Sequence, residues 1–259
     1  YKSAEGLRAK KIVGDRLCVR SGGYAIYKKG TYGVFLGKGI SEKAEIKETI
    51  KSIIDSGADF VKVINSGIIH SKGHITPGGF DFEELKIICN EAQERGMKIA
   101  CHANGDQKIK EAIIAGASSI EHGFLMSEKT LYLMKEKGVS WTPTVYALKA
   151  YSNLLNKEEK IFIEKIIDNH LELLNHAASI GISLNVGTDS GSRGVNHRES
   201  FLEELRLFQK AGIPFDKIIA SACMEDEEIE KGNYLFIEKD FIETGVVSPS
   251  FIKAEASDS

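Results

Sequence analysis

Two histidines lie in similar sequence contexts in the middle of the chain. His102 ends the segment Gly96-Met-Lys-Ile-Ala-Cys-His, and His122 ends the segment Gly116-Ala-Ser-Ser-Ile-Glu-His. In both segments a glycine precedes a short apolar run and the histidine closes it, which indicates the carboxyl ends of two successive buried strands. Imidazole nitrogen is a common ligand of divalent metal ions, so the two histidines are candidate metal ligands.

Three other polar residues occupy equivalent places in the chain. Lys62 interrupts the apolar run Phe60-Val-Lys-Val-Ile, where a lone ammonium group must be paired, neutral or modified. Thr144 and Asp189 each follow closely after a short apolar run. Taken singly, each of these residues has a purely structural explanation. The lysine can lie at a strand edge, the aspartate can cap a turn, and a histidine can be a buried core residue. At the ends of successive strands, the lysine, the histidines and the aspartate together are typical of a metal site.

The elements that must hold these residues recur as a helix, a glycine, a short apolar strand and a loop. Ser41 is expected to cap the first helix, and Asp81 with Glu84 to form a capping box at the second. Apolar residues at helical spacing predict the helices, and the apolar runs after each glycine predict the strands. The predicted helices cover residues 41–57, 81–96, 107–115, 127–137, 157–180 and 198–211, and the predicted strands cover residues 15–20, 59–64, 97–101, 117–120, 139–142 and 182–186.

This alternation is typical of an α/β fold with a parallel sheet, and the lack of a Gly-x-Gly-x-x-Gly turn favours a TIM-type (β/α)8 barrel over a dinucleotide-binding fold. A closed barrel needs about eight strands, so this one is expected to be incomplete at the N-terminus. Residues 21–39 are predicted to form a long glycine-rich loop, either functional or loosely packed. We assign residues 1–224 to a partial barrel domain and residues 225–259 to a tail without a functional interpretation.

Composition limits the classes of partner. The net charge of -3 gives no reason to expect nucleic acid or an anionic membrane surface, and the expected partner is a small-molecule substrate. The chain contains no apolar run of the about 18 residues that a spanning helix needs, and its first residues are too polar for a signal peptide. The 4 cysteines show no paired spacing. Reduced thiols, and therefore a cytoplasmic location, are expected.

The ordered set of motifs resembles the metal-dependent amidohydrolase superfamily, most of all its imidazolonepropionase-like and Xaa-Pro dipeptidase-like branch. The likeness covers roughly residues 41–212. The motifs that carry it are Phe60-Val-Lys-Val, His102-Ala-Asn-Gly, Ile120-Glu-His-Gly, Pro143-Thr144 and Gly187-Thr-Asp-Ser.

The resemblance implies a role for each matching residue. Lys62 would be carboxylated by carbon dioxide, and its carbamate would bridge two divalent metal ions, with zinc expected. His102 and His122 would bind the more exposed ion. Asp189 would bind the buried ion and act as the catalytic proton shuttle. The implied reaction is attack of metal-held hydroxide on the carbonyl of a dipeptide, an N-acyl amino acid or a cyclic amide.

Other polar residues have weaker claims on the site. Tyr146 and His197 would contact the substrate. His70 and His74 are interpreted as substrate-loop or surface residues, and His170 as a structural residue of a long helix.

The chain departs from the family pattern in two ways. The family carries a His-X-His pair at the end of its first barrel strand, whereas no two of the 7 histidines here are two positions apart. The flanking β-sandwich of the family is also missing. The sequence is therefore expected to be a fragment of a longer enzyme, a degenerate paralogue without turnover, or a piece completed by another chain.

Two alternatives to an active binuclear hydrolase follow from these departures. The first is a non-catalytic protein that binds a ligand or one metal ion. The second is a mononuclear deaminase of the same superfamily, which Lys62 disfavours because such enzymes usually lack the strand lysine. An upstream His-X-His would restore the hydrolase interpretation. An open barrel exposes parallel strand edges, so association with another chain, such as a second copy, is expected.

Overall fold

The computed structural model of the protein describes residues 20–197 and 199–223. The strand predicted over residues 15–20 lies outside these ranges except for Arg20, and so does the tail at residues 225–259. Among the described helices, none combines the length and the apolar composition that crossing a membrane would require.

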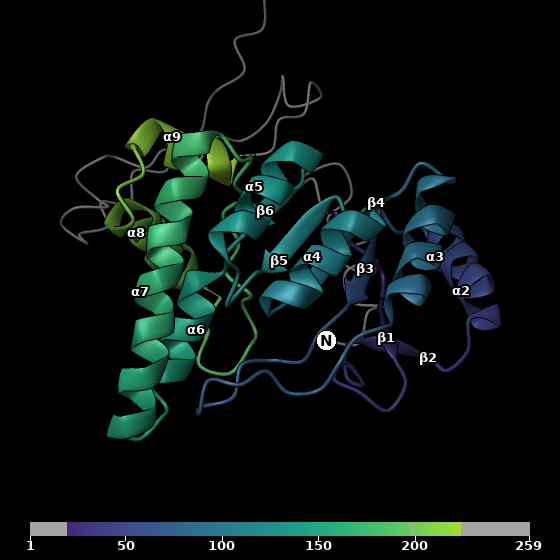
Figure 1. Cartoon of the computed structure of the whole chain (residues 1–259), viewed down its shortest axis with the longest axis horizontal. Helices are drawn as coiled ribbons and strands as arrows, with labels where there is room; N and C mark the ends of the chain where they lie inside the picture. The colour runs from purple at the N-terminus through teal and green to yellow at the C-terminus, as the bar shows by residue number, and fades with distance from the viewer. Residues whose placement is uncertain (1–19, 198, 224–259) are drawn as a thin grey trace, which may run out of the picture.

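A parallel sheet forms the centre of the described structure (Figure 1). Its strand order is β2-β1-β3-β4-β5-β6, so the sheet does not close on itself within residues 20–197 and 199–223. Each strand pairs in parallel with its neighbours. The strands are β1 (Ala25–Lys28), β2 (Gly37–Ile40), β3 (Phe60–Ile64), β4 (Lys98–Ala103), β5 (Ser119–His122) and β6 (Ser140–Thr142).

From β2 onward a helix follows each strand, and the helices pack against one another along the sheet, which is the arrangement of a barrel's outer layer (Figure 1). The helices are α2 (Ala44–Asp55), α3 (Phe82–Gln93), α4 (Asp106–Ala115), α5 (Glu128–Lys137), α6 (Val145–Ser152), α7 (Lys157–Ile180), α8 (Ser200–Lys210) and α9 (Phe215–Ala222). The α/β class and the open, barrel-type sheet predicted from the sequence are confirmed in this part of the chain.

The two faces of the sheet differ because successive side chains of a strand point to opposite sides. On the helix-covered face, Val61, Ile99, Ile120 and Trp141 are completely or almost completely buried. The inner face lines an open cavity of about 1890 Å³. The polar side chains that line it include Lys62, Lys98, Ser119, Glu121, Ser140 and Thr142.

Short sequence patterns predicted the positions of most helices and strands correctly. The capping box is present at α3, where the Glu84 backbone N–H donates to Asp81 Oδ1 at 2.7 Å and the Asp81 N–H donates to Glu84 Oε2 at 3.2 Å. The bounds of α7 are those predicted. Helix α5 begins after Ser127, whose hydroxyl oxygen accepts from the Thr130 N–H.

Three expectations are wrong. Ser41 does not cap the first helix, because the residue before α2 is Lys43, which makes no side-chain capping hydrogen bond. Residues 21–39 contain β1 and most of β2 rather than one loop, because strand pairing there comes from close backbone approach and not from an apolar pattern. A Cβ at Gly37 would lie 1.9 Å from the carbonyl oxygen of Ala25. The strand predicted at residues 182–186 is reduced to a single bridge between Leu184 and Trp141 of β6. Helices α6 and α9 were not predicted.

Candidate functional site

His102 and His122 meet at the carboxyl ends of β4 and β5. The parallel register places His122 beside Ala103, and the two imidazole ring centroids lie 4.6 Å apart at an interplanar angle of 72°. His102 is buried, and its Nε2 donates to the carbonyl oxygen of Gly67 at 3.0 Å. With the proton on Nε2, the Nδ1 lone pair of His102 remains for a ligand.

His122 is held at its side chain and at its backbone. Its Nδ1 lies 2.7 Å from Thr144 Oγ1, and its carbonyl oxygen accepts from Trp141 Nε1 at 2.9 Å. Its φ of 67° is left-handed, a conformation that is uncommon outside glycine and is retained where the surroundings hold it. The backbone therefore turns at the strand end and departs from the strict alternation of β5.

Both imidazoles are kept neutral by their surroundings. Burial, followed by the neighbouring His122 ring, lowers the pKa of His102 to about 3. Burial, followed by the positive charge of Lys62, lowers the pKa of His122 to about 3. Metal ions bind the neutral form of imidazole, so the low pKa values suit both rings for that role.

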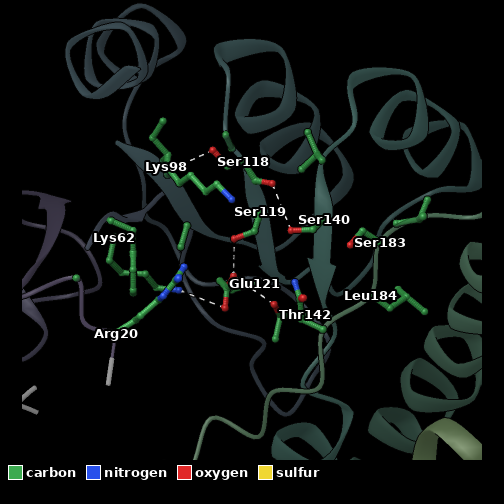
Figure 2. A pocket seen from close by; sticks show the side chains of 18 of the residues that line it. Arg20, Lys62, Lys98, Ser118, Ser119, Glu121, Ser140, Thr142, Ser183 and Leu184 are labelled. Carbon is green, nitrogen blue, oxygen red and sulfur yellow. Dashed lines mark hydrogen bonds and ion pairs between the residues drawn. The ribbon is translucent and has the colours of Figure 1, made fainter. Parts of the chain in front are cut away.

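Lys62 points from β3 toward Glu121 of β5, and Nζ of Lys62 lies 3.7 Å from Oε2 of Glu121 (Figure 2). Two hydroxyl groups also donate to Glu121 Oε1, Ser119 Oγ at 2.8 Å and Thr142 Oγ1 at 3.4 Å. Glu121 was not singled out from the sequence. The available signal was strand alternation, which puts Glu121 of β5 and Lys62 of β3 on the same inner face, on the two strands that flank β4.

Asp189 lies in the loop after the residue 182–186 segment and is exposed. It has a left-handed φ of 53°, and its Oδ2 accepts from Ser192 Oγ at 2.6 Å. After burial, its negative charge contributes to the raised pKa of Tyr32, and it weakly opposes the burial that lowers the pKa of His102. The structure therefore brings Asp189 within electrostatic reach of the histidine site.

Tyr32 is a residue of this site that sequence reasoning missed. It belongs to the loop between β1 and β2, and its ring centroid lies 5.5 Å from that of His102. Burial, followed by the charge of Asp189, raises the pKa of its phenol to about 12. Phe35 packs edge-on against it at 5.6 Å and is itself exposed. The only sequence feature that pointed to this region was the predicted glycine-rich loop.

The other predicted residues occupy different positions. Tyr146 is partly buried in the first turn of α6, and His197 is exposed in the loop that also contains Asp189. His70 and His74 stack on each other with ring centroids 4.7 Å apart. Their loop reaches α7, where Ser71 Oγ donates to Glu159 at 2.6 Å. His170 is buried, as expected of a structural residue.

The side chains of this site are of types that bind divalent metal ions, but only a few of them converge. Within residues 20–197 and 199–223, no three histidine, cysteine, aspartate or glutamate side chains converge in a group that could hold a metal ion. Two neutral imidazoles and the adjacent Lys62 are brought together. Carboxylation of the lysine would add the oxygen donors that zinc-class ions accept.

Comparison with known proteins identifies relatives over most of the chain. A family model described as "Amidohydrolase family" matches residues 4–226. Ochratoxinase of Aspergillus niger is 31% identical over 156 residues, which is 58% of this chain and 32% of the relative. The chain therefore spans about a third of that relative's length.

Solved structures of two such proteins share the fold. A Xaa-Pro dipeptidase with bound methionine in its active site has a TM-score of 0.68 and 25% identity, covering 86% of this chain and 60% of that one. The crystal structure of A. niger ochratoxinase has a TM-score of 0.72 and 25% identity, covering 84% and 57%. Both structures contain much that this chain does not span.

Proposed function

This chain belongs to the amidohydrolase family, and on that premise we propose that the protein is a metal-dependent hydrolase of amide-type C–N bonds. Its substrate would be a dipeptide, an N-acyl amino acid or a cyclic amide. One observation carries the proposal: two imidazoles with lowered pKa values meet at adjacent strand ends beside Lys62. The similarity to a Xaa-Pro dipeptidase and an ochratoxinase supports it.

The proposed metal ligands are Lys62 as its carbamate, His102, His122 and Asp189. Two zinc ions per intact site are proposed, with carbon dioxide supplying the carboxyl group on Lys62. Bound divalent ions would polarise the amide carbonyl and make water a nucleophile near neutral pH.

The chain's own residues would orient the reaction. Gly67 fixes the Nε2–H tautomer of His102, and Thr144 holds the ring of His122. The Asp189 carboxylate would take a proton from water and pass it to the leaving nitrogen. The Tyr32 phenol beside His102 would donate a hydrogen bond to the substrate, and Tyr146 and His197 would contact its more distant parts.

Metal analysis with hydrolysis assays tests this function. We expect His102→Ala to weaken zinc binding at least tenfold, since loss of even an outer-sphere partner costs about 10- to 100-fold. Equilibrium dialysis with elemental analysis measures the affinity. His176→Ala is the matched control, because His176 lies on the outer surface of α7 against Tyr132. Hydrolysis of an amide panel that persists after complete metal removal would refute the proposal.

The loop between β1 and β2 suggests that the substrate carries an apolar group. Val34 and Phe35 are 67% and 59% exposed, and Phe35 contacts Tyr32 beside His102. We expect Phe35→Ala to raise KM about tenfold for substrates with an aromatic side chain and to leave KM for small substrates unchanged, because partial ring burial contributes about 1.5 kcal/mol. Phe162→Ala, 45% exposed on α7, is the control. Equal changes for both substrate types would contradict this prediction.

A non-catalytic metal- or ligand-binding protein is the second candidate. The observation that favours it is that no group of three metal-ligating residues forms in the part of the chain that the structure describes. Zinc binding without hydrolysis of any amide in the panel would identify this case.

Location and assembly are also proposals. The free thiols of Cys89, Cys101 and Cys223 support a reducing compartment, and we place the protein in the cytoplasm. Strands β2 and β6 lie at the two ends of the described sheet. Beyond β6 the described residues add only a single bridge, from Leu184 to Trp141. Sheet ends with so little strand pairing favour association, so a homo-oligomer is proposed.

A further inference from the structure

Helix α6 is capped by the carboxyl group of a glutamate from another helix. Glu204 of α8 is completely buried, and it accepts hydrogen bonds from the first two backbone N–H groups of α6. The Val145 N–H lies 2.8 Å from Oε1, and the Tyr146 N–H lies 2.6 Å from Oε2. The first N–H groups of a helix have no partner within the helix, so Glu204 supplies the cap.

The residue before α6 contacts His122 and does not cap the helix. At α3, α5 and α7 a local side chain caps the helix, whereas Thr144 makes no capping hydrogen bond. The hydroxyl of Thr144 instead contacts Nδ1 of His122 at 2.7 Å. Glu204 therefore leaves Thr144 available to His122.

Thr144 also adopts a backbone conformation that requires support. Its φ of 46° and ψ of 46° are left-handed, which is a genuine outlier for a β-branched residue. Such a conformation persists only where neighbouring contacts hold it. Glu204 holds the two residues that follow, and His170 Nε2 donates to the carbonyl oxygen of Pro143 at 3.2 Å on the other side.

We propose that Glu204 is a positioning residue: by capping α6 from α8, it holds Thr144 in its left-handed conformation and thereby sets the ring orientation and tautomer of His122. The Thr144 hydroxyl can accept from Nδ1–H or donate to Nδ1; in the proposed arrangement it accepts, and the Nε2 lone pair of His122 is presented to the site. The effect on His122 is independent of turnover, and only the use of Nε2 rests on the proposed function.

Nitrogen-15 NMR of the histidine side chains in the metal-free full chain tests the proposal. Long-range proton–nitrogen correlations distinguish the two neutral tautomers, and the His122→Gln variant assigns the signal. We expect one tautomer in the unmodified protein and loss of that single state, with mixed or reversed tautomers, in Glu204→Gln. The signal of His176 on the outer surface of α7 should not move.

Two variants separate positioning from general destabilisation. Glu203→Gln is the matched control on the same helix, because Glu203 pairs with Lys149 at 3.4 Å and makes no bond to the N-terminus of α6. Thr144→Val removes the hydroxyl and keeps the cap. It should change the His122 signal as Glu204→Gln does, and combining the two should add nothing further.

The outcomes divide cleanly. Unchanged His122 signals in a folded Glu204→Gln variant, or equal changes in Glu203→Gln, would overturn the proposal. If Glu204→Gln does not fold, Glu204→Asp is used, because it keeps the carboxyl group but shortens its reach. We expect a partial tautomer change there, and an unchanged His122 would likewise overturn the proposal. Absence of amide hydrolysis would refute the proposed function while leaving this result intact.

Discussion

Replacing Asp189 with asparagine is expected to lower kcat for amide hydrolysis by about 10² to 10⁴-fold, the range that a positioned proton-transfer group contributes. Asparagine has the same shape, also tolerates a left-handed backbone, and its side-chain oxygen can accept the hydrogen bond from Ser192. It cannot take up a proton. The change therefore removes the proposed shuttle and replaces one proposed metal ligand by a neutral amide oxygen, with little effect on the fold.

Steady-state kinetics and thermal unfolding together measure this result. The melting temperature of Asp189→Asn should stay close to that of the unmodified protein, and the loss should fall on kcat rather than on KM. Asp168→Asn, on the exposed face of α7, is the control and should leave kcat unchanged. Full activity in Asp189→Asn would remove Asp189 from the proposed mechanism.

Mild acid is expected to destabilise the metal-free protein strongly. Burial lowers the pKa of His102 and His122 to about 3 and that of His170 to about 4. In the unfolded chain the same rings titrate near 6.5, so their stabilising effect is present above that pH and is lost as the pH falls toward the folded-state values. As the pH falls from 7 to 5, each ring should lower the free energy of unfolding by about 1 to 2 kcal/mol.

The three rings together should lower the free energy of unfolding by about 3 to 6 kcal/mol, a large part of the 5–15 kcal/mol typical of a domain. Glu204 acts in the opposite direction, because burial raises its pKa to about 8 and its contribution to stability decreases as the pH rises from the unfolded value toward 8. It offsets only part of the histidine effect.

Urea unfolding at a series of pH values in the presence of a chelator measures this dependence, and a variant isolates one ring. In His170→Gln, the amide can still donate to the carbonyl oxygen of Pro143 while one titrating group is gone. Between pH 7 and pH 5, its free energy of unfolding should fall by about 1 to 2 kcal/mol less than that of the unmodified protein. His176→Gln, at the protein surface, should follow the unmodified protein. Identical pH dependence in all three proteins would show that the buried rings take up protons without unfolding.

Local sequence patterns alone placed much of the site. His102, His122 and Lys62 were assigned to strand ends or strand interiors because apolar runs after glycines identify short buried strands. The capping box at Asp81 and the bounds of α7 followed in the same way. These features depend on residues close together in the chain, whose spacing is sufficient to encode a helix, a cap or a buried strand.

The contacts that shape the site were decided only by the tertiary structure. Tyr32 against His102, Glu121 against Lys62 and Glu204 at the start of α6 each join segments that are far apart in the chain. A charge or an aromatic ring in a loop has the same local pattern whether it faces water or a partner. Parallel strand register and helix packing determine whether that group meets water or a partner. The sequence by itself therefore determined the positions of the histidines and the lysine, and only the fold determined what surrounds them.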